Sequence, residues 1–177
     1  MKSLRILAQI LLMALLGSCS SPPSAPMNTV ASVDLARYTG AWYEIALLPN
    51  EFQSMCVADT QARYRSDGDV IRVTNLCRKS DGSLAEVSGI AKIVAGSGNA
   101  KLRVSFFRPF YGDYWILALD PDYKWVLVGE PRRKYGWILS RAPRLDDRYL
   151  QLALDKASAL GYARAAFRLT PQTQALE

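Results

Sequence analysis

Histidine is absent from these 177 residues, and its absence excludes more functions than any residue that is present. Without an imidazole the chain cannot form a Ser-His-Asp triad or a Cys-His pair. It also cannot hold zinc or haem through histidine, and three cysteines are too few for a four-thiolate zinc site. We therefore expect neither a metal nor a cofactor. Catalysis by carboxylates, serine, tyrosine or lysine remains open, as does a protein without catalysis.

The composition is otherwise that of one folded domain. Half of the residues are hydrophobic and 21% are charged, which excludes a disordered chain. A chain of this length buries roughly 70% of its unfolded surface, so it can form a substantial core. Neither an internal repeat nor a second domain can be recognised in the sequence.

The first 18 residues resemble a lipoprotein signal peptide. Lys2 and Arg5 precede an almost wholly apolar segment, 6–16, which is shorter than the ~20 residues of a transmembrane helix. Leu16-Gly17-Ser18-Cys19 resembles a bacterial lipobox, so we expect cleavage before Cys19 and acylation of its thiol. An ordinary signal peptide that leaves a free thiol is the alternative. Residues 19–33 would then be the lipidated N-terminus and a flexible tether.

The expected destination of the chain is the cell outer membrane. Ser20 follows the cysteine at the position where an aspartate would resemble an inner-membrane retention signal. Several acyl chains anchor a protein stably in a membrane. We therefore expect a lipid-anchored protein that faces the periplasm.

The basic residues do not point to a nucleic-acid partner. Removing residues 1–18 takes away two positive charges and no negative ones, so the formal net charge falls from +6 to +4. The one basic run, Arg132-Arg133-Lys134, is either a solvated loop or a surface that contacts an anionic headgroup. No segment resembles a nucleic-acid-binding module, and a lipoprotein exported from the cytoplasm would not encounter the nucleic acid of the cell.

From residue 42 onward, the sequence predicts an all-β fold. Short apolar runs alternate with turn signals such as Asp67-Gly68, Asp81-Gly82 and Asp120-Pro121-Asp122. Eight antiparallel strands joined by short turns can close into an up-and-down barrel, which removes their exposed edges. The expected strands are 42–48, 57–65, 70–79, 84–94, 101–108, 113–120, 124–130 and 135–141.

Alternation along the strands separates the expected interior of the barrel from its surface. Lys101 and Arg103 should face water, so the apolar residues that alternate with them should face inward. By the same reasoning, strand 57–65 should expose its polar face, which consists of Asp59, Gln61 and Arg63.

One helix should follow the eighth strand, at about 146–160, and pack outside the barrel. Asp146 and Asp147 suit a helix N-terminus, and apolar residues recur at helical spacing from Leu150 to Leu160. Gly161 suits the position after the helix. A short strand could lie within 162–169. The expected domain spans 34–170 and is followed by a tail, 171–177.

Three motifs in this order resemble the lipocalin family. Gly40-Ala41-Trp42 resembles the Gly-x-Trp motif of the first strand. Asp122-Tyr123 resembles the Thr-Asp-Tyr motif, with Pro121 in place of threonine, and Arg141 resembles the arginine of the third motif. The lipobox, the Gly-x-Trp-Tyr-Glu opening and segments such as 104–107 and 137–141 resemble bacterial outer-membrane lipocalins of the Blc type, and the resemblance covers roughly residues 34–165.

The resemblance implies that Gly40, Trp42 and Arg141 close one end of the barrel. Trp42 would fill that end and Arg141 would lie across its indole, a cation–π contact worth about 0.5–2 kcal/mol. Glu44 has the same strand parity as Trp42 and would be a polar partner inside the barrel, or alternatively a catalytic acid. The other end would stay open for a ligand.

By the same resemblance, the barrel would carry fatty acids or lysophospholipids. Tyr114 would add a polar group near the mouth, and the Arg132-Arg133-Lys134 loop, at the open end, would contact a headgroup. The expected apolar wall consists of Leu102, Val104, Phe106, Tyr114, Ile116 and Trp137.

Cys56 and Cys77 are expected to form a disulfide. The hairpin centred on Asp67-Gly68 brings them within two residues of direct opposition, and a bulge could close that difference. An oxidising periplasm would favour the bond. One reactive thiol is the alternative.

The sequence as a whole favours a carrier that stores or transports lipids for envelope maintenance, without turnover. No Gly-x-Ser-x-Gly segment occurs, which argues against an esterase. A lipid- or isoprenoid-modifying enzyme and a lipoprotein that only contacts envelope proteins remain alternatives. Whether two copies pair as a homodimer stays open.

Overall fold

The computed structural model of the protein describes residues 26–174 and 176. The signal peptide, the lipobox with Cys19 and the first part of the expected tether lie outside these residues. Their assignments therefore remain predictions.

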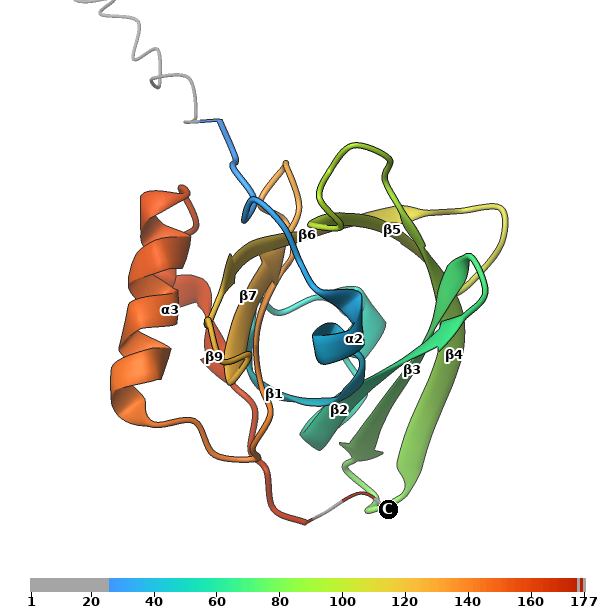
Figure 1. Ribbon diagram of the computed structural model, residues 1–177. Helices are drawn as coiled ribbons and strands as arrows, with labels where there is room; N and C mark the ends of the chain where they lie inside the picture. The colour runs from blue at the N-terminus through green and yellow to red at the C-terminus, as the bar shows by residue number, and fades with distance from the viewer. Residues whose placement is uncertain (1–25, 175, 177) are drawn as a thin grey trace, which may run out of the picture.

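Eight antiparallel strands close into an up-and-down barrel, which confirms the predicted fold class (Figure 1). Each strand pairs with the next one in sequence, and β1 closes the ring by pairing with both β8 and β2. The strands are β1 (Gly40–Leu47), β2 (Cys56–Asp67), β3 (Val70–Lys79), β4 (Leu84–Ile93), β5 (Lys101–Ser105), β6 (Gly112–Leu119), β7 (Trp125–Gly129) and β8 (Gly136–Ser140).

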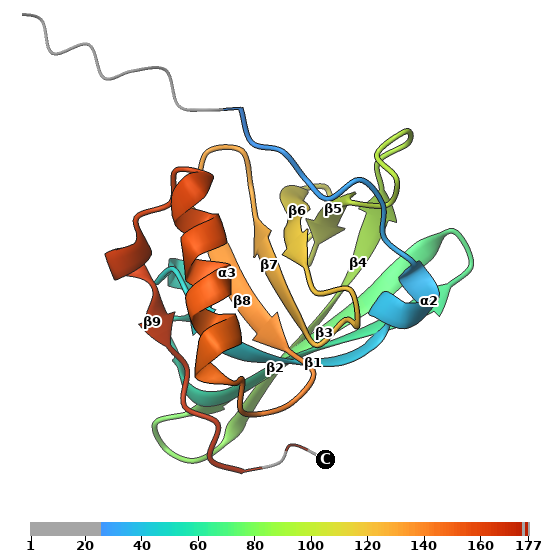
Figure 2. The same cartoon turned by 60° about the vertical axis from the view of Figure 1, so that its left-hand side comes forward.

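The predicted helix is α3 (Asp147–Ala159), which lies along the outside of the barrel beside β7 (Figures 1 and 2). The Asp146 side chain caps it by accepting a hydrogen bond from an amide of the first turn, and Gly161 follows it with φ +87°. Ala153 and Ala157 are fully buried, since their small side chains let the helix approach the sheet closely. Among the described residues, no helix is long and apolar enough to cross a membrane.

A short helix that the sequence did not predict, α2 (Leu35–Tyr38), closes one end of the barrel. Figure 1 shows it in the middle of the ring of strands. The Asp34 side chain caps it by accepting hydrogen bonds from the amides of Ala36 and Arg37. Because α2 immediately precedes β1, the loops joining β1 to β2, β3 to β4, β5 to β6 and β7 to β8 lie at the opposite, open end.

The last part of the expected flexible tether is ordered against the barrel. The Val30 amide donates to the Ile116 carbonyl (3.0 Å), and the Val33 amide donates to the Gly98 carbonyl (2.8 Å). Val33 is also buried. The prediction that all of 19–33 is a tether is therefore wrong at its C-terminal end, because these residues add hydrogen bonds and apolar contact to the barrel.

The barrel wall forks at β1. Residues up to Tyr43 pair with β2, whereas Ala46 and Leu47 pair with a ninth, two-residue strand, β9 (Arg168–Leu169). A register shift in the β1–β8 ladder lies at the same point, between Glu44 and Ala46. The fork therefore leaves a gap between the second half of β1 and the start of β2.

The C-terminal segment fills the outer side of this gap. After the turn η2 (Arg164–Ala166) and β9, residues 170–174 run along β2, and the amide of Asp59 donates to the Pro171 carbonyl (2.8 Å). Asp59 and Gln61 are buried beneath this segment, and Arg63 is partly covered. The prediction that these three face water is wrong, because alternation shows which residues leave the barrel but not what packs on them.

The predicted disulfide between Cys56 and Cys77 is present, with the two Cα atoms 5.5 Å apart. The pairing of Gln61 with Leu76, continued without a break, would place Cys56 opposite residue 81. Two register shifts bring Cys56 opposite Lys79 instead, two residues from Cys77. Bulges in β2 therefore bring the two cysteines together, as expected.

Replacing both cysteines by serine should lower the free energy of unfolding by about 3 kcal/mol, because the bond restricts the unfolded chain over a separation of 21 residues. Urea unfolding followed by circular dichroism would measure the loss. Reduced wild-type protein should unfold at the same urea concentration as the double variant. Equal stability of the oxidised protein and the variant would contradict the prediction.

Candidate functional site

Trp42 and Arg141 close the barrel as predicted. Trp42 is fully buried, and the Arg141 guanidinium carbon lies 3.8 Å from the centre of its ring. Arg141 Nη1 donates to the Ala41 carbonyl (2.8 Å), while Trp42 Nε1 donates to the Tyr38 carbonyl (2.8 Å). Gly40 has φ +94°, and a Cβ there would lie 3.4 Å from Arg141 Nη1. All three residues therefore serve the closed end.

The second motif holds α2 in place. The Tyr123 hydroxyl accepts a hydrogen bond from the Asp34 amide (2.9 Å), and the Arg37 guanidinium lies 4.1 Å from the centre of the Tyr123 ring. The Pro121 carbonyl accepts from Arg37 Nη2 (3.1 Å). Proline at the position where the lipocalin motif has threonine is compatible with this contact, because Arg37 bonds to the backbone carbonyl of Pro121.

All six residues of the predicted wall lie in the cluster that fills the barrel interior. Leu102 and Ile116 are fully buried, and the other four are partly buried against the same cluster. The inward orientation of this set is therefore correct. Leu102, Val104, Phe106, Tyr114, Ile116 and Trp137 are apolar or aromatic and so present a surface suited to an acyl chain.

Tyr114 does not place its hydroxyl near the mouth, contrary to expectation. This hydroxyl bonds with those of Tyr38 (2.8 Å) and Tyr64 (2.9 Å), and Tyr38 belongs to α2 at the closed end. Burial raises the pKa of all three phenols, that of Tyr64 to about 12. The three hydroxyls are therefore neutral at physiological pH and form a polar floor.

An aromatic row leads from the rim to the wall. Phe52, which is 71% exposed, lies 5.5 Å from Tyr135 between ring centres, and Tyr135 stacks on Trp137 at 6.2 Å. The Lys134 ammonium lies 5.4 Å from the centre of the Tyr135 ring. A polar headgroup at this rim would therefore meet one cation beside an aromatic surface.

The predicted basic run does not act as one patch. Arg133 Nε donates to the Leu160 carbonyl at the end of α3 (2.6 Å), where a cation complements the helix dipole. Arg132 is exposed and pairs with Glu130 (3.6 Å). Of the three residues, Lys134 is the one directed at the aromatic row.

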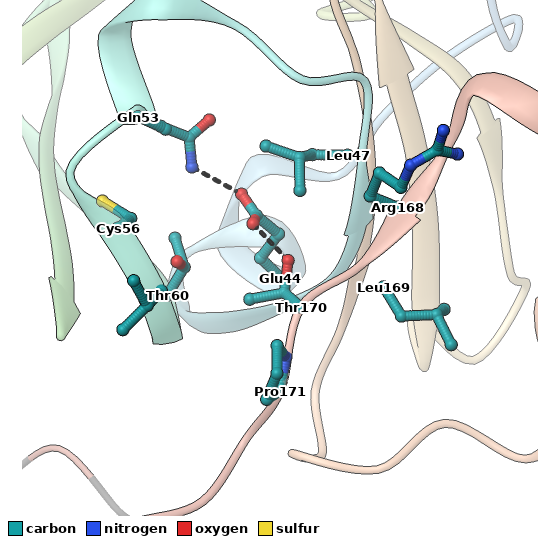
Figure 3. A pocket seen from close by; sticks show the side chains of 10 residues that line it. Glu44, Leu47, Gln53, Cys56, Thr60, Arg168, Leu169, Thr170 and Pro171 are labelled. Carbon is teal, nitrogen blue, oxygen red and sulfur yellow. Dashed lines mark hydrogen bonds between the residues drawn. The ribbon is translucent and has the colours of Figure 1, made fainter. Parts of the chain in front are cut away.

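A pocket of about 190 Å³ lies at the fork between β1 and β2 (Figure 3). Glu44, Gln53, Thr60 and Thr170 are among its polar residues. Glu44 is 3% exposed, and its oxygens accept hydrogen bonds from Gln53 Nε2 (2.7 Å) and Thr170 Oγ1 (2.5 Å). Burial raises the pKa of Glu44, and these two hydrogen bonds offset only part of the effect.

Gln53, on the turn η1 (Glu51–Gln53), links this pocket to the wall. Its Oε1 accepts a hydrogen bond from Trp137 Nε1 (2.8 Å), while its Nε2 donates to Glu44. The turn is itself capped by Asn50, whose side chain accepts from the Gln53 amide. Glu44 is therefore a polar partner joined to the barrel interior, as expected from its parity.

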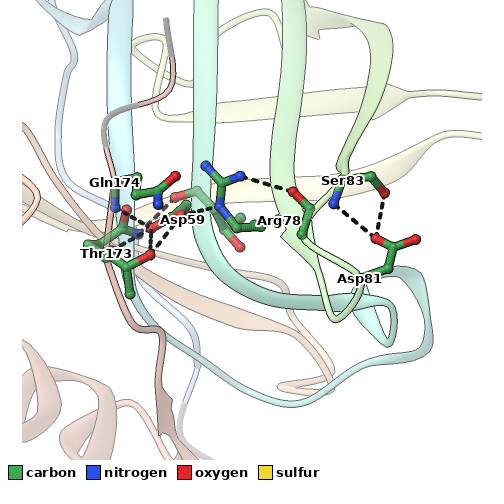
Figure 4. Close-up of polar contacts among 9 residues, drawn as sticks. Asp59, Arg78, Asp81, Ser83, Thr173 and Gln174 are labelled. Atoms are coloured by element: carbon green, nitrogen blue, oxygen red, sulfur yellow. Dashed lines mark hydrogen bonds and ion pairs between the residues drawn. The ribbon is translucent and has the colours of Figure 1, made fainter.

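A second buried carboxylate, that of Asp59, holds the C-terminal segment 170–174, whose first two residues line the pocket (Figure 4). Asp59 accepts hydrogen bonds from Arg78 Nε (2.7 Å), from the Thr173 amide and hydroxyl, and from the Gln174 amide (3.1 Å). Burial would raise the pKa of Asp59, but the Arg78 guanidinium and the two amides outweigh it and lower the pKa. Asp59 thus ties the C-terminal segment to β2 and β3.

The sequence did not point to Gln53, Thr60 or Thr170 as site residues. They belong to a loop, to a strand position beside a bulge and to the expected end of the domain. Only the fork in β1 brings them together, and no local pattern signals a fork. Glu44 was the one member that strand parity could identify.

The lipocalin-like domain family matches residues 33–172 of the chain. The chain is 38% identical over 156 residues to temperature-induced lipocalin-1 of Arabidopsis thaliana, covering 83% of each chain. It is 36% identical over 169 residues to the outer membrane lipoprotein Blc of Escherichia coli (strain K12), covering 94% of this chain and 96% of that one. The solved structure of insecticyanin from the tobacco hornworm Manduca sexta matches with a TM-score of 0.67 at 25% identity, covering 86% of each chain.

Proposed function

This chain belongs to the lipocalin-like domain family, and on that premise we propose that it is a lipid-binding lipoprotein of the cell outer membrane. It would store or transport fatty acids or lysophospholipids for envelope maintenance. The observation that carries this proposal is the apolar and aromatic wall inside a barrel that Trp42, Arg141 and α2 close at one end.

The membrane anchor in this proposal is the acylated Cys19, with the barrel facing the periplasm. Two features support it: the lipobox-like Leu16-Gly17-Ser18-Cys19 and the similarity to outer membrane lipoproteins over more than nine-tenths of the chain. The ordered residues after the tether run past the closed end. The anchor would therefore leave the open end free to meet lipid.

An enzyme on the same barrel is the less favoured function. Glu44, the carboxyl weighed as a catalytic acid, is held by two neutral donors at the fork. The tyrosines of the floor have raised pKa values, which makes them poor bases. The arrangement is therefore better suited to binding a molecule than to transferring its protons.

Replacing Trp137 by alanine should weaken the binding of a C16 lysophospholipid about tenfold, because the indole supplies apolar contact to the acyl chain. Fluorescence competition on the full-length lipoprotein would measure the dissociation constant. Trp115→Ala is the matched control, since Trp115 is also half-buried but packs outside the barrel under the Lys101 ammonium, 4.0 Å away. An equal loss of affinity in the two variants would argue against a binding site for the acyl chain at Trp137.

The identity of the natural ligand can be read from the purified protein. Native mass spectrometry of the lipoprotein taken from membranes, with extraction of bound molecules, should show one lipid per chain and no product. An enzyme would yield product from added lipid and would lose turnover on Glu44→Gln. A barrel without bound lipid that captures none would contradict the carrier.

A further inference from the structure

The pocket at the fork contains a buried carboxyl that has no cationic partner. In the described part of the chain, no lysine or arginine forms an ion pair with Glu44, although the side chain is almost fully buried. The hydroxyl of Thr60, which is 7% exposed, lines the same pocket and has no hydrogen-bond partner among the described residues. Buried polar atoms are normally hydrogen-bonded and buried charges are normally paired, so the unpartnered hydroxyl and the unpaired carboxyl indicate a site for a polar group.

The amide and hydroxyl donors of Gln53, Thr170 and Gln172 beside Glu44 are already used. Gln53 Nε2 and Thr170 Oγ1 both donate to Glu44. Gln172 Nε2 donates to the backbone carbonyls of Glu44 (2.8 Å) and Thr60 (3.1 Å), bridging the strands where they separate. Beside Glu44 there remain the free lone pairs of its carboxyl and the hydroxyl of Thr60, which can accept or donate.

A primary ammonium matches this remaining capacity. It offers three donors, needs no acceptor and carries the charge that a buried carboxylate needs as a partner. A carboxylate or phosphate placed here would be repelled by Glu44, and a trimethylammonium offers no N–H donor. The volume of about 190 Å³ suits a small group, since pockets for whole ligands usually measure about 300–1,000 Å³.

We propose that the pocket formed by Glu44, Thr60, Gln53 and Thr170 binds a primary ammonium group, carried by a lipid whose acyl chain lies in the barrel. This inference rests on the proposed lipid-binding function and names the headgroup class, an ethanolamine-type lysophospholipid. Gln53 contacts both Glu44 of the pocket and Trp137 of the wall, so the pocket lies next to the barrel interior. Arg168 also lines the pocket, with its guanidinium directed away from Glu44, and leaves a positive charge for the phosphate (Figure 3).

Binding of the ammonium should release a proton from Glu44. Burial raises the pKa of Glu44 in the free protein, and a bound cation favours the ionised form. Affinity should therefore increase with pH through the pKa of Glu44, by up to tenfold per unit. Gln53, Thr60 and Thr170, which face the carboxyl from η1, β2 and the end of β9, do not titrate, and Arg168 is the other charged residue that lines the pocket.

The test compares lysophosphatidylethanolamine with lysophosphatidylglycerol and lysophosphatidylcholine of the same acyl chain, on the full-length lipoprotein. At pH 8 the ethanolamine lipid should bind about tenfold more tightly than the other two. Glu44→Gln should abolish this preference and its pH dependence. Glu51→Gln is the matched control, since Glu51 is exposed on the same loop. Thr60→Val, which removes only the unpartnered hydroxyl, should weaken the ethanolamine lipid a few-fold.

Free ethanolamine separates the source of the ammonium from the pocket itself. Competition by millimolar ethanolamine that depends on Glu44 but not on the acyl chain would assign the site to free amines. Equal binding of the three lipids would overturn the headgroup inference and leave the carrier intact. Failure of every lipid to bind would defeat the carrier, and failure of ethanolamine as well would defeat the pocket. If Glu44→Gln does not fold, Thr60→Val tests the pocket instead, through the ratio of the affinities for the ethanolamine lipid and for lysophosphatidylglycerol.

Discussion

Replacing Trp42 by alanine should lower the free energy of unfolding by about 4 kcal/mol, a large share of the ~5–15 kcal/mol of a typical domain. The indole is fully buried, stacks under Arg141 and lies 5.2 Å from the Tyr38 ring between centres. Its loss would leave a cavity below α2 and would remove the aromatic ring on which Arg141 stacks. Urea unfolding monitored by far-ultraviolet circular dichroism would measure the change.

Phenylalanine substitutions separate the ring from its N–H group. Trp42 Nε1 donates to the Tyr38 carbonyl, whereas Trp125 Nε1 is buried without a partner among the described residues. Trp42→Phe should therefore cost about 1 kcal/mol, while Trp125→Phe should be close to neutral. A loss below 1 kcal/mol for Trp42→Ala would mean that the closed end does not depend on this residue.

The strands and α3 could be predicted because their signals are local. Asp67-Gly68 and Asp81-Gly82 mark turns. In α3, the buried small residues Ala153 and Ala157 are four positions apart, which is helical spacing. The closure by Trp42 and Arg141 was available only through the family motifs, because the two residues are far apart in the chain. Physical chemistry explains this contact but does not reveal it from spacing alone.

The features that the sequence did not reveal arise where distant segments meet. Alternation on β2 places Asp59 outside the barrel, which is correct, but it cannot show that residues 170–174 cover that face. Tyr114 was assigned to the wall with the lipocalin resemblance, yet the depth of its hydroxyl depends on α2, which supplies Tyr38. The fork likewise depends on β9 displacing β2 from the second half of β1.

Asn in place of Asp59 should destabilise the protein by about 3 kcal/mol at pH 7, because it leaves Arg78 partly buried without its charged partner. An amide also replaces one of the two acceptor oxygens that bind Arg78, Thr173 and Gln174. The matched control is Asp67→Asn on the same strand. Asp67 pairs with Arg72 of β3 as Asp59 pairs with Arg78, but in solvent, so its loss should cost under about 1 kcal/mol.

The effect of Asp59→Asn should depend on pH with a defined sign. The pKa of Asp59 is lowered in the folded protein, so its contribution is complete above the unfolded pKa, about 3.9, and is lost as the pH falls through the folded value. The difference in stability between wild type and variant should therefore be constant from pH 7 to about 5 and shrink below about 4. Urea unfolding at a series of pH values would measure it.

The same substitution should act locally before it acts globally. Thr173 and Gln174 contact β2 through Asp59. Thr170 and Gln172 of the same segment donate hydrogen bonds to Glu44 at the fork. Releasing the first pair should raise amide hydrogen exchange across residues 170–174 while the strands opposite α3 stay protected. Unchanged protection of the Thr173 amide would show that the Gln172 bridge, and not the buried carboxylate, holds the segment on the barrel.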